Sequence, residues 1–238
     1  MILENDTVLK ERQEDRKQIF DEAILEKMKK TKGVAQIVPI IYTEITVPWE
    51  PEFTDLWMRE FYETWMDIPY EQEKQEYQEY PENFGSSLVG ITEEEFRDLN
   101  ASLEEPIDED AFLKGKTCLL YRNGLSFKKE DVAGKNITCT EYGNLDNQLS
   151  FDIAGLVDLN DYTALLGYPP TIIVSDTVVK SFVNNPVVYK LEICYEKSHD
   201  QETEASLLSI MEETPYKKDY SYDSKIKLEE NVKKHRGI

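Results

Sequence analysis

The side chains best suited to chemistry are few in this chain. Histidine occurs twice, as His199 in a polar turn and His235 in a charged tail. Neither has a cysteine or histidine partner at the spacing of a metal site. The sequence also contains no G-x-S-x-G motif, which would mark a serine nucleophile. We therefore expect no catalytic residue, no metal site and no cofactor.

Two further motifs lead to the same expectation. Gly115-Lys116-Thr117 resembles the end of a phosphate-binding loop, but that loop needs a glycine where Asp110 stands and a helix where a strand is predicted. Asp158-Leu159-Asn160-Asp161 offers oxygen ligands for Ca²⁺ but too few for a recognised loop, so it indicates a turn. Paired carboxylates are too numerous to indicate a hydrolase.

The three cysteines, Cys118, Cys139 and Cys194, lie in strand-like segments with hydrophobic neighbours. Their spacing matches no metal or redox motif, and a free cysteine commonly packs as a small apolar side chain. We predict core packing for them. A disulfide between two of them stays open, because spacing alone does not decide it.

The negative charge is concentrated in one part of the chain. The formal net charge is −21, and the segment from Glu50 to Asp110 holds 20 acidic residues against three basic ones, a net charge of −17. Such a surface repels nucleic acid and anionic lipid headgroups. It suits either a cationic partner or a solvated insertion kept soluble by its charge, and we favour the second reading.

The composition is that of a folded chain without a membrane span. Hydrophobic residues make up 40% of the 238 residues and aromatic residues 11%, which exceeds what disordered chains contain. No stretch reaches the ~20 apolar residues that a membrane helix needs. The first residues lack the pattern of a signal peptide, so both a cytosolic protein and a soluble piece of a larger one stay open.

Apolar periodicity predicts the elements that would position any site. A helix is expected over Leu9–Lys32, polar in its first half, and a strand over Val34–Val47. Thr92 with Glu95 is typical of a capping box that begins the next helix. Short strands separated by glycine turns fill residues 115–175, including a hairpin around residues 143–147.

The most distinctive helix carries aromatic residues at intervals of four. We predict it over residues 52–67, with four rings on one side, which is usually a packing face. Its acidic back also makes it a candidate for recognition. The candidate partner-binding residues are Phe53, Trp57, Glu60, Phe61, Glu63 and Trp65.

The order of elements predicts an α+β fold. A helix-and-strand subdomain, residues 1–110 and 171–238, is interrupted by a mostly β subdomain, residues 111–170. The chain is expected to enter and leave through polar helices.

Several runs together resemble the extracytoplasmic domain of FtsX/MacB-type ABC transporter permeases. Lys32-Gly33-Val34-Ala35-Gln36-Ile37-Val38-Pro39 after a helix, and the strand and helix starting at Leu88, are similar to that family's first elements. Residues 115–120, 132–138 and 151–157 resemble its inserted β subdomain, and residues 171–175 its return strand. Residues 48–86 are longer and more acidic than the family core.

The resemblance implies a porter-like subdomain with a β insertion, held at the extracytoplasmic face of the membrane by stalk helices at residues 1–20 and 224–238. It implies transmission of ATP-driven motion to a substrate or an accessory protein, without catalysis. The implied partners are the flanking transmembrane helices, a cytoplasmic ATPase, and a second permease copy or an accessory protein. Nucleic acid is not among them.

A different class of function remains open beside this one. The chain could be a freestanding acidic protein that binds a cationic peptide or a glycan through the helix from Phe53 to Trp65. Neither reading identifies a transported substrate.

Overall fold

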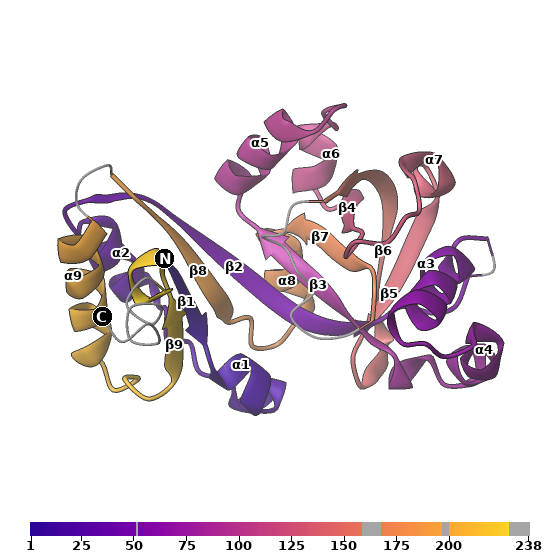
Figure 1. The fold of residues 1–238 in the computed structure, drawn as a ribbon, viewed down its shortest axis with the longest axis horizontal. Helices are drawn as coiled ribbons and strands as arrows, with labels where there is room; N and C mark the ends of the chain where they lie inside the picture. Colours follow the sequence, from indigo (N-terminus) through magenta and orange to yellow (C-terminus); the bar gives the residue numbers. More distant parts are fainter. Residues whose placement is uncertain (51, 159–167, 197–199, 229–238) are drawn as a thin grey trace, which may run out of the picture. The chain divides into compact units, whose positions relative to one another are not determined.

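The computed structural model describes residues 1–50, 52–158, 168–196 and 200–228. These residues form an α+β fold, which confirms the predicted class (Figure 1). Contacts divide the chain into two compact units, which we call unit 1 (residues 1–41 and 185–238) and unit 2 (residues 42–184).

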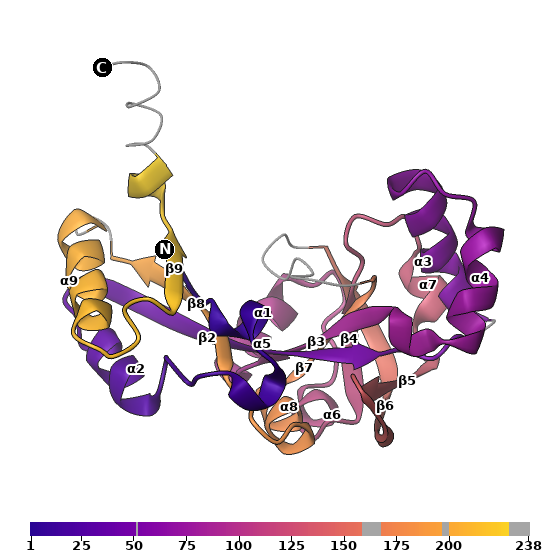
Figure 2. The ribbon, with the colours of Figure 1, turned by 90° about the horizontal axis from the view of Figure 1, so that it is seen from below.

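Unit 1 contains an antiparallel sheet with the strand order β2-β8-β1-β9. Its elements are β1 (Ile2–Asn5), α1 (Thr7–Lys10), the 3-10 turn η1 (Gln13–Asp15), α2 (Glu22–Lys29), the first part of β2 (Val34–Thr46), β8 (Val188–Tyr195), α9 (Asp200–Glu212) and β9 (Tyr220–Asp223). Helices α2 and α9 lie side by side (Figures 1 and 2). They bury Ile24, Met28, Leu207 and Met211. These apolar side chains are part of the core of unit 1.

The start of the chain differs from the prediction. The helix expected over Leu9–Lys32 is broken into α1, η1 and α2, and the residues before α1 form strand β1. In β1, Leu3 is fully buried and pairs with Leu191 of β8 and Tyr222 of β9. The predicted stalk helix at residues 1–20 is therefore wrong. The polar stretch after Lys10 does not continue a helix because it carries no apolar stripe to pack.

At the other end, residues 225–228 are helical, and the rest of the predicted stalk helix at 224–238 lies outside the described residues.

Unit 2 contains a mixed sheet with the order β3-β7-β4-β6-β5, and the last residues of β2 pair with β5. The pairs β3/β7 and β4/β6 are parallel, while β4/β7 and β5/β6 are antiparallel. Its strands are β3 (Gly85–Ile91), β4 (Thr117–Tyr121), β5 (Asn136–Glu141), β6 (Asn144–Val157) and β7 (Thr171–Ser175). Its helical elements are α3 (Thr54–Glu60), the π-helix η2 (Phe61–Trp65), α4 (Tyr70–Glu79), the 3-10 turn η3 (Pro81–Asn83), α5 (Glu93–Ser102), α6 (Glu109–Leu113), α7 (Lys129–Val132) and α8 (Asp176–Phe182).

The local signals of unit 2 are confirmed. The Thr92 hydroxyl accepts a hydrogen bond from the Glu95 backbone N–H at 3.3 Å, which caps α5 as predicted. Strands β5 and β6 form the expected hairpin, with Gly143 at φ 79° in its turn. Along β6, Phe151 and Ile153 are buried and Asp152 is exposed, as the alternation requires.

The units do not follow the predicted division at residues 110 and 170. Strand β7 pairs with both β3 and β4, so residues 85–91 belong to the same sheet as the block predicted to be a separate insertion. The divisions lie instead after Ile41, within β2, and after Asn184. The predicted boundaries would separate strands that are hydrogen-bonded to each other and leave their backbone groups unpaired.

Candidate partner-binding site

The six candidate residues lie in a helical hairpin of unit 2, residues 52–83, which we call the acidic helical segment. It comprises α3, η2, α4 and η3, with α3 and α4 side by side (Figures 1 and 2). Asp67, at φ 55°, lies in the turn between them. Phe53 and Trp57 of α3 and Tyr70 and Tyr77 of α4 are buried.

The predicted single helix changes its winding halfway. After Glu60 the chain continues as the π-helix η2, in which the Met66 backbone N–H donates to the carbonyl of Phe61, five residues earlier, at 3.2 Å. A π-turn holds more residues than an α-turn, so side chains spaced by four no longer stay on one face. The predicted stripe of four rings is therefore wrong beyond Phe61.

The four rings have different surroundings. Phe53 and Trp57 are buried, and Trp57 is fully inaccessible; Phe61 is half-buried and Trp65 is 57% exposed. The ring of Trp57 lies 5.1 Å from that of Phe53 and 5.9 Å from that of Phe127, centroid to centroid. Phe53 and Trp57 thus hold the segment on the body of unit 2, as the packing interpretation predicts.

Both candidate carboxylates have partners within unit 2. The carboxylate of Glu60 accepts from the Ser126 backbone N–H at 2.8 Å and from its hydroxyl at 2.9 Å. That of Glu63 forms an ion pair with Arg59 at 3.2 Å. Glu60 therefore anchors the segment to the loop after β4, while the exposed Glu63 and Trp65 remain available to a partner. Their binding role stays a prediction.

A second aromatic cluster was not anticipated from the sequence. The ring of Tyr168 lies 5.4 Å from Phe61, 6.0 Å from Tyr62 and 5.1 Å from Phe84. Tyr70 stacks on Tyr62 at 6.1 Å, and Tyr77 packs on Phe84 at 5.0 Å. Tyr70 and Tyr77 are spaced by seven residues, which is two helical turns. That spacing is the signal that could have revealed this packing face.

The polar centre of the segment is the carboxylate of Asp55. Its Oδ1 accepts from Trp49 Nε1 at 2.6 Å and from the Tyr70 hydroxyl at 2.7 Å, and its Oδ2 accepts from Lys74 Nζ at 2.6 Å. Partial burial alone would raise the pKa of Asp55, but the hydrogen bonds from Lys74, Trp49 and Tyr70 outweigh it and hold the pKa below its ordinary value. This carboxylate is structural, since all its donors belong to the segment or the turn before it.

The two sequence motifs that resemble phosphate and calcium sites have structural roles in the described residues. Gly115 lies in a turn before β4 at φ 68°, and a strand follows, so the chain there does not form a phosphate-binding loop. Asp158 forms an ion pair with Arg122, while residues 159–161, His199 and His235 lie outside the described residues. Within the described ranges, no group of three or more His, Cys, Asp or Glu side chains could hold a metal ion.

The cysteines divide into two kinds. Cys118 and Cys139 are buried, as predicted, whereas Cys194 is exposed, so core packing was a wrong expectation for it. All three are free thiols. Burial raises the pKa of Cys118 far above its ordinary value and that of Cys139 to about 12. Only the Cys194 thiol is therefore accessible to a reagent in the folded protein.

The helices in the described part of the chain are all too short or too polar to cross a membrane.

The chain resembles known proteins in its three-dimensional structure. No model of a known protein family matches the chain, and no curated protein sequence does. The periplasmic region of MacB from Actinobacillus actinomycetemcomitans aligns with a TM-score of 0.53 and 13% sequence identity, over 98% of this chain and 91% of that one. This chain has the fold of the MacB periplasmic region. The resemblance inferred from the sequence is thus confirmed at the level of the fold.

A second solved structure is also similar to this chain. The extracellular domain of the noncanonic ABC-type transporter YknZ from Gram-positive bacteria aligns with a TM-score of 0.48 and 14% identity, over 86% of this chain and 89% of that one.

Proposed function

We propose that this chain is an extracytoplasmic domain of an FtsX/MacB-type ABC transporter permease. The observation that carries the proposal is the fold shared with the MacB periplasmic region along nearly the whole chain. In such a permease the domain transmits ATP-driven motion of the membrane helices to a substrate or accessory protein, and hydrolysis takes place on a separate cytoplasmic ATPase.

The path of the chain in unit 1 supports this proposal. Strands β1 and β9 pair antiparallel, with Ile2 opposite Asp223, so the first and last strands are neighbours. A domain inserted between two membrane helices needs its two ends close together, because both continue into the same permease.

The first test is the reading frame that encodes the chain. We expect it to continue on both sides into segments of about 20 apolar residues, the length that spans a bilayer. A complete frame without such segments on both sides would refute the proposal and favour a freestanding protein.

The second test addresses transmission itself. Spin labels on Lys27→Cys in α2 and Glu94→Cys in α5, both at exposed sites in different units, report the distance between them when Cys194 is replaced by serine. In the full permease with its ATPase, we expect ATP to change this distance distribution, and a hydrolysis-deficient ATPase to arrest the cycle in one state. An unchanged distribution during active ATP turnover would contradict a transmitting role.

A further inference from the structure

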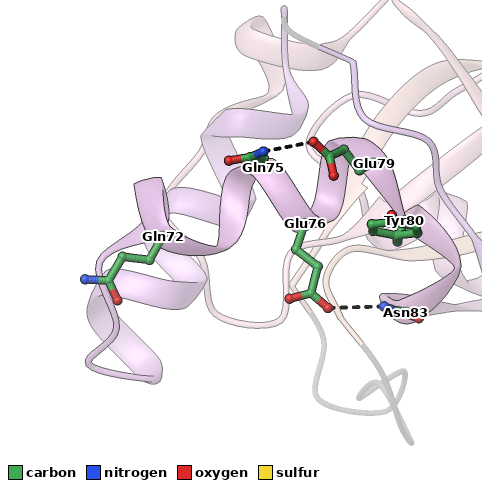
Figure 3. A pocket seen from close by; sticks show the side chains of 6 residues that line it. All are labelled: Gln72, Gln75, Glu76, Glu79, Tyr80 and Asn83. Carbon is green, nitrogen blue, oxygen red and sulfur yellow. Dashed lines mark hydrogen bonds between the residues drawn. The ribbon is translucent and has the colours of Figure 1, made fainter.

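The outer face of α4 carries a hollow of about 500 Å³. The residues that line it recur every three or four positions, so they share one side of the helix and of the turn that follows. They are Gln72, Gln75, Glu76, Glu79, Tyr80 and Asn83 (Figure 3). None of them belongs to the aromatic set singled out from the sequence.

Neutral carboxamides hold the two carboxylates of the hollow in place. Gln75 Nε2 donates to Glu79 Oε1 at 2.9 Å, and Asn83 Nδ2 donates to Glu76 Oε1 at 3.1 Å (Figure 3). These bonds orient the carboxylates without neutralising them. In the part of the chain that the structure describes, neither carboxylate forms an ion pair with a lysine or arginine.

The ring of Tyr80 also lines the hollow, and Tyr80 is 52% exposed. An aromatic face attracts a lysine ammonium or an arginine guanidinium that lies over it. Two oriented carboxylates beside an open ring therefore match a cationic side chain with an apolar stem.

The charges around the hollow favour a cation from outside the segment. The two bases of the segment are already engaged, because Lys74 pairs with Asp55 at 2.6 Å and Arg59 pairs with Glu71 at 2.6 Å. The surrounding surface thus keeps its negative potential, which steers a basic chain toward it.

We propose that the α4 hollow binds a basic segment of a partner protein, with a lysine or arginine side chain seated between Glu76, Glu79 and the Tyr80 ring. This site goes beyond the role as a permease domain, since binding can be measured on the protein alone. Its failure would leave the permease proposal standing, and the reading-frame test above would leave this one standing.

The probe is a fluorescent capped nonapeptide of three Gly-Arg-Gly repeats, with three Gly-Gln-Gly repeats as the uncharged comparison. We expect saturable binding of the arginine peptide that weakens as salt rises, and none of the glutamine peptide. The double variant Glu76→Gln/Glu79→Gln should bind about fivefold more weakly. The control Glu94→Gln/Glu104→Gln makes the same change in charge at two exposed carboxylates elsewhere, and its binding should stay near that of the native protein.

The ring is tested by a matched pair of tyrosines. Tyr80→Ala should weaken the arginine peptide about two- to fivefold. Tyr142→Ala removes a ring that is 49% exposed on the β5–β6 hairpin and should change nothing. Because these side chains are exposed, both variants are expected to keep the native melting temperature.

Three results would overturn the proposal. Equal weakening by the two double variants would mean attraction by net charge alone. Equal loss in the two tyrosine variants would place the peptide elsewhere. Binding of maltotriose that is weakened by Tyr80→Ala but not by Glu76→Gln/Glu79→Gln would assign the hollow to a neutral saccharide instead.

Discussion

The substitution Asp55→Asn is expected to loosen the acidic helical segment. Asn has almost the same shape but no charge, and only one of its two terminal atoms accepts hydrogen bonds. With that oxygen toward Trp49 and Tyr70, the amide nitrogen would face the ammonium of Lys74, where the native carboxylate accepts at 2.6 Å. The bond to Lys74 is therefore lost, and the other two become bonds to a neutral acceptor.

The expected cost follows from these three bonds. A hydrogen bond to a charged group contributes about 1.5–3 kcal/mol and one between neutral groups about 0.5–1.5 kcal/mol. Losing one charged bond and weakening two to neutral ones would cost about 3.5–6 kcal/mol in a fully buried site. Because the Asp55 side chain is 26% exposed, water replaces part of this, and we expect a loss of about 2 kcal/mol in the free energy of unfolding.

All three tryptophans of the chain, Trp49, Trp57 and Trp65, lie in or beside the acidic helical segment. Urea unfolding followed by tryptophan fluorescence at pH 7 therefore reports on this part of unit 2. The control Asp146→Asn makes the same change at an exposed carboxylate in the hairpin and should leave the unfolding midpoint unchanged. Equal midpoints for the two variants would refute the reasoning.

The same variant has a pH signature. Since the pKa of Asp55 is lowered in the folded state, its stabilising contribution is complete above the ordinary value of 3.8 and is lost as pH falls through the lower folded-state pKa. The stability difference between the native protein and Asp55→Asn should therefore shrink below about pH 4. A difference that stays constant down to the acid limit of folding would contradict the proposed charge network.

Two further substitutions test other parts of the fold. Gly124→Ala should cost about 2 kcal/mol, because Gly124 has φ 79° and an added Cβ would lie 3.2 Å from the Trp65 ring; Gly134→Ala, at φ 75° with nothing within 4 Å, should cost only about 1 kcal/mol for the backbone. Equal losses in urea unfolding would mean that Trp65 does not pack there. Leu3→Ala should cost about 2–5 kcal/mol in thermal unfolding because Leu3 is fully buried in β1, while Ile2→Ala, at a 37% exposed side chain, should cost far less. If Leu3→Ala left the stability unchanged, Leu3 would not be buried in a strand, and this part of the chain would be a solvated stalk.

The features that the sequence predicted depend on local signals. The cap at Thr92, the hairpin at Gly143 and the strand from Val34 each follow from a few neighbouring residues whose backbone preferences agree. The resemblance to permease domains was also recognised from the order of such local elements, and the shared fold confirms it.

The features that the sequence did not predict depend on pairing between distant residues. Strand β1 is short and partly polar, and it is a strand because β8 and β9 lie on either side of it, about 190 and 220 residues further on. The boundaries of the units were not predicted for the same reason, because they depend on the pairing of β7 with both β3 and β4. Such contacts leave no periodic trace within either strand.

The candidate site was predicted in part. The ring spacing located the acidic helical segment and its packing role, but it assumed a uniform α-helix, and the π-turn at Phe61–Trp65 redirected Trp65 to the surface. The hollow on α4 was not foreseen, because its side chains are polar and give no amphipathic signal.

The most direct test of the permease proposal uses the protein's own thiols. Cys194 is exposed, whereas Cys118 and Cys139 are buried and serve as internal controls. Cells that express the full-length protein, stripped of any outer wall, are treated with a membrane-impermeant maleimide. If the domain is extracytoplasmic, Cys194 is labelled in intact cells, and the Cys194→Ser variant loses that labelling. Labelling of Cys194 only after the membrane is permeabilised would place the domain in the cytoplasm and contradict the account.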